Sequence, residues 1–158
     1  MRLCSFLVLS ACCLFEDGDG SPNLPNFGVG ADDSVGTNYY ENMTHGEKVV
    51  ILNERTYPHP KSKENWMIKF YAPWCGACKG MRKTWAILAG RSNGDYKVGA
   101  LDCTNSLNRH FCQQFKLDRF PHIKFVSGGK SKEYKGSQMS VYEMKQFIKK
   151  NSVKTGKK

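Results

Sequence analysis

Apolar residues in the second two thirds of the chain fall into short runs that polar turns separate, a pattern typical of alternating strands and helices. The run 49–52 predicts a first strand. The longer run 66–71 predicts a strand that is buried on both faces. A polar turn at 91–95 precedes a further predicted strand at 97–102.

Helical spacing follows two of these strands. Residues 76–89 predict a helix whose buried face carries Met81, Trp85 and Leu88. Thr104 can cap a second helix that runs to about residue 115. The apolar residues expected on its buried side are Leu107, Phe111 and Phe115.

The last third predicts a hairpin and a closing helix. A strand at 123–126 meets the turn Ser-Gly-Gly-Lys, which leads into a short strand at 132–134. Ser140 can cap a helix to residue 150, with Met144, Phe147 and Ile148 facing inward. The order of strands and helices predicts an α/β sandwich around a mixed sheet, with its domain at 48–151.

The first fifteen residues predict a secretory signal peptide. Arg2 supplies a positive start, and the apolar run 3–15 is too short to span a bilayer. An alternative is a bacterial lipoprotein processing site that would leave a lipid on Cys12. No later segment is long and apolar enough to predict a transmembrane helix.

Two polar segments flank the predicted domain. Residues 16–47 are rich in Gly, Asp, Asn and Pro and predict an acidic flexible linker, whereas 152–158 predict a basic tail. Asn42 begins an Asn-Met-Thr triplet, an acceptor pattern for N-glycosylation that also arises by chance in unmodified loops.

Charge is distributed unevenly along the chain. The net charge is +10, but residues 48–158 hold 23 basic against 7 acidic side chains. This excess could attract acidic partners or anionic surfaces; the alternative is an ordinary solvated face. The lysines lack interleaved aromatic residues and a nucleic-acid motif, so we expect no binding to DNA or RNA.

The chain has seven cysteines, of which the first three lie in the predicted signal segment. The remaining four are Cys75, Cys78, Cys103 and Cys112, an even number that suits two pairs in an oxidising compartment. Cys75 and Cys78 form a C-x-x-C motif between a predicted strand and a predicted helix. Backbone N–H groups at a helix N-terminus favour the thiolate, which is the attacking species in disulfide exchange.

This motif and its surroundings resemble the protein disulfide isomerase family over residues 48–150. The segments that carry the resemblance are Phe-Tyr-Ala-Pro-Trp-Cys-Gly-Ala-Cys-Lys at 70–79, Leu-Asp-Cys at 101–103, Cys-x-x-Phe at 112–115, Phe-Pro-His-Ile-Lys-Phe at 120–125 and Tyr-Lys-Gly at 134–136. The resemblance implies a thioredoxin fold, a central mixed β-sheet flanked by helices.

The resemblance also implies roles for single residues. Cys75 would be the nucleophile, and Cys78 would resolve the mixed disulfide by attacking Cys75. Pro121 would be cis and face Cys75, and Trp74, Phe120 and Pro121 would contact the substrate. The chemistry needs no cofactor. A bare C-x-x-C could be half of a zinc site, but we expect no metal because the fold should hold the two cysteine pairs apart.

Cys103 and Cys112 are expected to form a structural disulfide. Their spacing resembles that of a pair in the thioredoxin domains of sulfhydryl oxidases. A second redox couple is the alternative.

Four positions depart from the family: Lys69, Ala77, Lys83 and Gln138. Lys69 stands where members usually carry a buried carboxylate that relays protons to the second active-site thiol. Gln138 stands where isomerases often carry an arginine. A charged Lys69 would favour the thiolates, a buried neutral one could take a proton, and one that reaches the surface would matter little. The sequence leaves these three interpretations open.

The predicted function is thiol–disulfide exchange with cysteine-containing protein clients of the secretory pathway, in the endoplasmic reticulum lumen or outside the cell. A second hypothesis is a binding module that traps partners as long-lived mixed disulfides. A purely structural domain is the third, which the intact motif disfavours.

Overall fold

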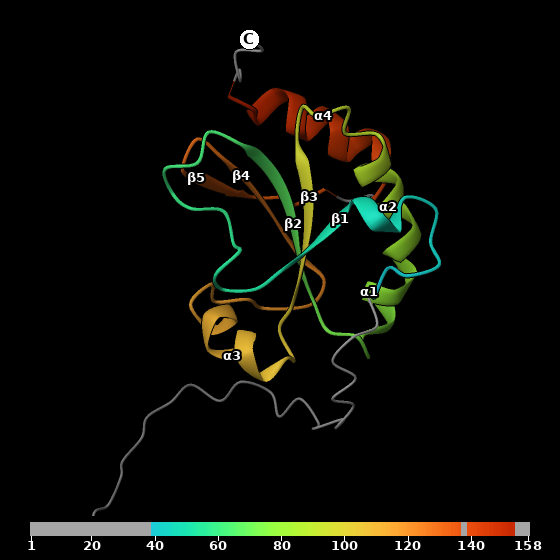
Figure 1. Ribbon diagram of the computed structural model, residues 1–158, viewed down its shortest axis with the longest axis vertical. Helices are drawn as coiled ribbons and strands as arrows, with labels where there is room; N and C mark the ends of the chain where they lie inside the picture. Colours follow the sequence, from blue (N-terminus) through green and yellow to red (C-terminus); the bar gives the residue numbers. More distant parts are fainter. Residues whose placement is uncertain (1–38, 137–138, 154–158) are drawn as a thin grey trace, which may run out of the picture. The chain divides into compact units, whose positions relative to one another are not determined.

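A five-stranded sheet in the order β1-β3-β2-β4-β5 organises the part of the chain that the computed structural model describes, residues 39–136 and 139–153 (Figure 1). The strands are β1 (Val49–Leu52), β2 (Asn65–Tyr71), β3 (Lys97–Asp102), β4 (His122–Ser127) and β5 (Lys130–Glu133). β3 pairs in parallel with both β1 and β2, whereas β4 is antiparallel to β2 and to β5. This mixed sheet confirms the predicted fold class.

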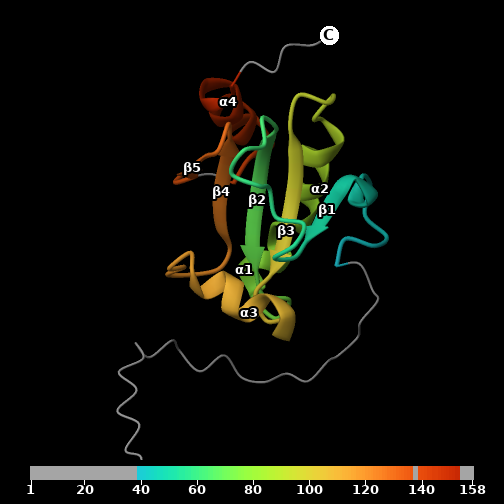
Figure 2. The same cartoon turned by 60° about the vertical axis from the view of Figure 1, so that its left-hand side comes forward.

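Helices cover both faces of the sheet. They are α1 (Gly76–Gly80), α2 (Arg82–Gly90), α3 (Ser106–Gln113) and α4 (Val141–Asn151), with a 3₁₀ turn η1 at Gly46–Lys48. One apolar cluster joins α2 and α4 to the sheet, and a second joins α3 to the opposite face. Figure 2 shows α2 and α4 behind the strands.

The central strand β2 is buried at every residue, as its continuous apolar run predicts. Met67 and Tyr71 belong to the cluster under α2 and α4, whereas Ile68 and Phe70 belong to the cluster under α3. Because side chains alternate along a strand, Lys69 points to the same face as Met67 and Tyr71. A lysine therefore enters an apolar layer.

Three details of the predicted helices differ. The helix expected over 76–89 breaks at Met81 into α1 and α2, although its expected inner residues are buried. Asn105, not Thr104, caps α3, with its Oδ1 accepting from the Leu107 N–H at 2.9 Å. The buried side of α3 is centred on Asn108 and Cys112, so Leu107 lies outside it and is 79% exposed.

The hairpin and the last helix form as predicted. Gly128 and Gly129 have φ values of 54° and 76°, and a side chain at Gly129 would collide with the Pro60 carbonyl. The Ser140 Oγ accepts from the Glu143 N–H at 3.2 Å and caps α4.

The domain begins earlier than the sequence predicts. Tyr40 lies in the segment expected to be linker, yet it is fully buried in the cluster under α2 and α4. Residues 39–47 therefore pack as part of the domain, because their tyrosines supply apolar surface. The composition of the segment does not indicate this, because Gly, Asn and Asp outnumber the tyrosines. Asn42 in this segment is exposed, with a φ of 63°.

Several expectations lie outside the described residues. These are the signal peptide at 1–15, the linker up to residue 38, Gln138 and the tail from residue 154. At the start of the predicted tail, the Val153 N–H donates to Ser127 Oγ at 2.9 Å. No helix in the described part of the chain has the length and apolarity to cross a membrane.

Candidate active site

Cys75 lies in the connection between β2 and α1 and is the N-cap residue of that helix. Its N–H donates to the Ala72 carbonyl at 3.1 Å, which closes the turn that leaves the strand. Its Sγ accepts from the Cys78 N–H at 3.4 Å and lies 3.6 Å from the Phe120 carbonyl. The residue is half-buried. The sulfur at the start of α1 therefore accepts a backbone N–H while part of the residue stays accessible.

Cys78 is on the first turn of α1 and is fully buried. Both it and Cys75 are free thiols. The pKa of the Cys78 thiol is raised to about 12, mainly because burial removes water from it. The backbone at Ala72 and a positive charge on Lys69 act in the opposite direction. Burial therefore favours the neutral thiol form of Cys78.

The residues expected to contact substrate lie around Cys75. The Phe120–Pro121 peptide bond is cis, the conformation that the family resemblance implies. Trp74 is 48% exposed, beside the half-buried Cys75. A small hollow of about 90 Å³ adjoins this region, lined by Pro121, His122 and Met139 among others.

Lys69 is fully buried in the middle of β2. The interpretation that its side chain reaches the surface is therefore wrong. Its Nζ has no hydrogen-bond partner among the described residues. Burial is the main cause that lowers the pKa of Lys69, to about 8; a negative charge on Cys78 opposes this effect and the guanidinium of Arg82 adds to it.

Four aromatic rings surround the Lys69 ammonium. The distances from Nζ to the ring centroids are 5.6 Å for Tyr39, 5.0 Å for Tyr40, 5.5 Å for Tyr71 and 5.6 Å for Trp85. We call these four rings the aromatic cage. A cation gains from facing such rings, which partly offsets the water it has lost.

Sequence reasoning predicted no contact between Lys69 and any of these four rings, and it assigned two of them to a linker. Tyr39 and Tyr40 come from the segment that the sequence assigns to a linker. They join the cage through contacts with residues that are distant in sequence. The Arg82 guanidinium donates to the Tyr39 carbonyl and lies 4.5 Å from the Tyr39 ring centroid. The adjacent tyrosines in an otherwise polar stretch were the signal that could have revealed the contact.

Cys103 and Cys112 form a disulfide, with a Cα–Cα distance of 5.7 Å. It joins the residue after β3 to the last turn of α3, and both sulfurs lie in the apolar cluster under that helix. The predicted pairing is therefore present. In the part of the chain that the structure describes, no group of side chains is suited to hold a metal ion.

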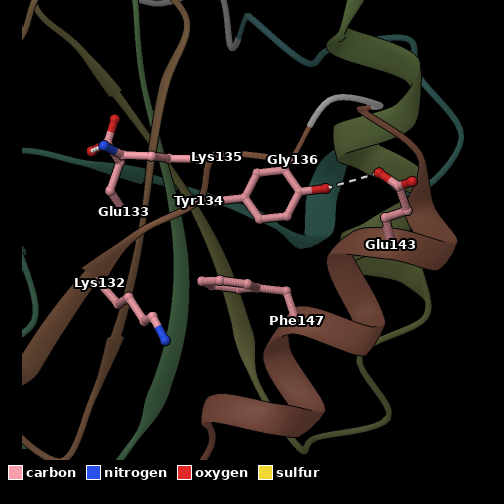
Figure 3. Close-up of a pocket in the computed structure, with 7 residues that line it drawn as sticks. All are labelled: Lys132, Glu133, Tyr134, Lys135, Gly136, Glu143 and Phe147. Atoms are coloured by element: carbon pink, nitrogen blue, oxygen red, sulfur yellow. Dashed lines mark hydrogen bonds and ion pairs between the residues drawn. The ribbon is translucent and has the colours of Figure 1, made fainter.

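A larger hollow of about 680 Å³ lies between β5 and α4 (Figure 3). Phe147 and Tyr134 form its apolar wall, and Lys132, Glu133 and Lys135 line the rest together with Gly136 and Glu143. The Tyr134 hydroxyl lies 3.5 Å from the Glu143 carboxylate. This hollow shares Glu133, Tyr134, Lys135 and Gly136 with the smaller hollow beside Pro121.

Three features define the class of thioredoxin-fold proteins. They are a mixed sheet with crossing helices, a strand that leads into a C-x-x-C helix, and a cis proline beside the first thiol. Residues 48–150 match the thioredoxin family. The chain belongs to that family.

Curated relatives point in the same direction. A protein disulfide-isomerase A6 homolog of Caenorhabditis elegans is 32% identical over 101 residues, which cover 60% of this chain and 22% of the relative. A thioredoxin domain-containing protein 5 homolog of Drosophila melanogaster is 31% identical over 112 residues, which cover 70% of this chain and 26% of the relative. This chain thus spans about a quarter of the length of either relative.

Solved structures share the fold. The crystal structure of the J-Trx1 fragment of ERdj5 superposes with a TM-score of 0.60 at 22% identity, covering 68% of this chain and 54% of that chain. At this identity the similarity establishes the architecture. Together the family match and the relatives assign the chain to thioredoxin-like proteins of the thiol–disulfide oxidoreductase kind.

Proposed function

We propose that this protein is a thiol–disulfide oxidoreductase of the protein disulfide isomerase type, with Cys75 as nucleophile and Cys78 as resolving thiol. The observation that carries the proposal is the placement of Cys75 at the N-terminus of α1, half-buried, with its Sγ facing the Cys78 N–H. A sulfur in this position accepts a backbone N–H and can be reached by a client.

The exchange uses two displacements at sulfur. The Cys75 thiolate attacks a client disulfide, so that one client sulfur leaves as thiolate and the other is bonded to Cys75. The Cys78 thiolate then attacks Cys75, the Cys75–Cys78 bond forms, and the client leaves reduced. Two electrons pass from the cysteine pair to the client, and the reverse sequence oxidises a client dithiol. Trp74, Phe120 and Pro121 would hold the client segment during the first step.

Protein clients of the secretory pathway suit this site best. The relatives include a protein disulfide-isomerase A6 homolog, and a buried disulfide such as Cys103–Cys112 persists in oxidising compartments. The exposed Asn42 would then be available for glycosylation. Expression through a eukaryotic secretory pathway should give a glycosidase-sensitive form that Asn42→Gln lacks; equal mobility of both proteins before and after treatment would contradict this.

The decisive experiment compares turnover with trapping. The wild type should reduce insulin and refold scrambled ribonuclease catalytically, and Cys75→Ser should do neither. Cys78→Ser should accumulate mixed disulfides through Cys75. The double variant Cys103→Ser/Cys112→Ser is the matched control and should retain turnover.

The complete burial of Cys78 favours a second function. Burial raises the pKa of the Cys78 thiol to about 12, which would slow resolution and prolong mixed disulfides. The chain would then act as a binding module. Stoichiometric adducts of the wild type without insulin turnover would establish that function instead.

A further inference from the structure

The hollow between β5 and α4 takes no part in the two displacements at sulfur. It measures about 680 Å³, against about 90 Å³ for the hollow beside Pro121. Its wall is aromatic, because the Tyr134 and Phe147 rings meet edge to face with their centroids 5.1 Å apart. Figure 3 shows Lys132 beside the Phe147 ring, and the Lys132 Nζ lies 5.8 Å from that ring centroid. The hollow therefore combines an aromatic wall with an exposed cation.

β5 forms one edge of the sheet, and within residues 39–136 and 139–153 no further strand pairs with its outer side. Lys132 is the partner of Phe125 in the β4–β5 ladder, so its side chain is on the face that α4 covers. An extended polypeptide that paired with the outer side of β5 would direct alternate side chains to this same face, over the hollow. The open edge and the hollow together suit a strand with one apolar side chain pointing inward.

Positive charge surrounds the hollow. Residues 130–136 and α4 contain two glutamates against six lysines, which are Lys130, Lys132, Lys135, Lys145, Lys149 and Lys150. Both glutamates have partners, since Glu133 lies 3.3 Å from the Lys135 Nζ and the Glu143 carboxylate lies 3.5 Å from the Tyr134 hydroxyl. A partner segment with acidic residues beside its apolar side chain complements this charge.

The hollow is continuous with the candidate redox site through the residues that it shares with the hollow beside Pro121. The Cys75 Sγ lies 3.6 Å from the carbonyl of Phe120, the residue before that proline. From there the path follows the start of β4 and crosses to Tyr134, whose N–H donates to the Ile123 carbonyl at 2.9 Å. Three residues along a strand and one strand spacing across amount to about 11–15 Å, which an extended chain covers in about three to five residues.

We propose that this hollow is a specificity subsite for clients, which binds an aromatic side chain that is flanked by acidic residues and lies about three to five residues from the client cysteine. The inference deepens the proposed function and rests on it, because it names the class of client segment that Cys75 attacks. The segment pairs with the edge of β5, its ring packs against Phe147, and its carboxylates face the surrounding lysines.

Peptides that carry one cysteine as a mixed disulfide with thionitrobenzoate test the subsite. The Cys75 thiolate attacks the peptide sulfur, the Cys75–peptide disulfide forms, and the coloured thionitrobenzoate anion leaves, because its thiol has the lower pKa. The test peptide carries Asp-Phe-Asp about four residues from the cysteine on both sides, joined by Gly and Ser. Two matched peptides carry Asp-Ser-Asp or Lys-Phe-Lys instead.

Stopped-flow absorbance gives the rate constant for each peptide with the reduced wild type. Dividing it by the rate constant for dithiothreitol and the same peptide removes differences in the reactivity of the peptides themselves. We expect the corrected rate constant for Asp-Phe-Asp to exceed that for either matched peptide about 10-fold at low salt. The advantage over Lys-Phe-Lys should shrink at about 0.5 M salt, because salt screens the lysines.

Variants of the protein locate the effect. Lys132→Glu/Lys135→Glu reverses two exposed charges at the hollow and should remove most of the preference for Asp-Phe-Asp over Lys-Phe-Lys. Lys48→Glu/Lys83→Glu reverses two exposed charges outside β5 and α4 and is the matched control, which should keep the preference. Phe147→Ser should abolish the preference for Asp-Phe-Asp over Asp-Ser-Asp. Circular dichroism checks that each variant is folded, and the lysine variants decide the case if Phe147→Ser does not fold.

The outcomes distinguish this inference from the proposed function. A reduced wild type that expels thionitrobenzoate from no peptide would overturn the proposed function and the inference with it. Equal corrected rate constants for the three peptides would overturn the inference alone. So would a preference that both lysine variants keep or lose to the same extent, because the net charge of +10 would then explain it. A concentration-dependent dimer of the wild type that Lys132→Glu/Lys135→Glu abolishes would assign the hollow to a second copy of the chain instead.

Discussion

The two cysteine pairs of this domain follow neighbouring parallel strands but have different surroundings. Cys75 starts a helix, and its sulfur faces a backbone N–H and the Phe120 carbonyl. Cys112 lies in the last turn of α3, where the helix dipole disfavours negative charge, and its disulfide to Cys103 is buried among apolar side chains. Under the proposed function, helix polarity and access, more than the cysteines themselves, separate the reactive pair from the structural one.

The largest expected effect concerns turnover. Cys75→Ser should reduce insulin reduction to the uncatalysed background, because the attacking sulfur is gone. Cys103→Ser/Cys112→Ser should keep most of the wild-type rate at a temperature where it remains folded. If the second variant loses turnover while folded, the distal pair is a redox couple and the comparison fails.

Stability should show the reverse order. Loss of the Cys103–Cys112 disulfide should lower the free energy of unfolding by about 2–3 kcal/mol, since it closes a short loop in the unfolded chain. Urea denaturation of the double serine variant measures this. Opening the Cys75–Cys78 pair by reduction should change stability less, and a larger cost there would contradict the assignment of roles.

A third prediction follows from the buried amine. Lys69→Met should be more stable than the wild type by about 1–3 kcal/mol at neutral pH, because a charged amine no longer needs to be buried. The pKa of Lys69 is about 8 in the folded state, below the ordinary value of 10.5, so between these pH values the unfolded chain binds more protons. Wild-type stability should therefore rise with pH in that window, and the difference between the two proteins should close.

Urea denaturation at several pH values tests this with the Cys75–Cys78 pair oxidised, so that thiol titration does not contribute. Lys83→Met serves as the control and should follow the wild type. A difference that stays constant from about pH 7 to about pH 10 would mean that water reaches Lys69.

The smallest effect concerns the helix that holds Cys112. Asn105→Ala should cost about 1 kcal/mol, because its side chain caps α3. Thermal unfolding measures the loss, with Ser106→Ala, at an exposed neighbour, as the matched control. Equal stability of the two variants would show that the disulfide alone fixes α3.

Local patterns predict most of the fold. The buried run of β2, the Gly-Gly turn before β5 and the Ser140 cap of α4 each depend on residues adjacent in sequence, and each forms as expected. The errors arise where neighbours compete or where contacts are distant. Asn105 replaces Thr104 as a cap because Thr104 donates instead to Asp102 Oδ1 at 2.7 Å, and the shifted helix leaves Leu107 in solvent.

The candidate site divides in the same way. Helix-capping geometry around Cys75 follows from a motif of a few residues, so sequence reasoning could place it. The environment of Lys69 depends on tyrosines about thirty residues earlier and on Trp85 of α2, which no local pattern links. For this reason the sequence left three interpretations of Lys69 open, and only the packed structure removes the exposed one.

The early start of the domain has a practical consequence for transplanting this fold. The family match begins at residue 48, but a catalytic cassette excised there would leave behind Tyr39 and Tyr40. Such a cassette would keep its cysteines while losing two walls around Lys69. Chimeric proteins that borrow this redox centre should therefore carry the sequence from residue 39.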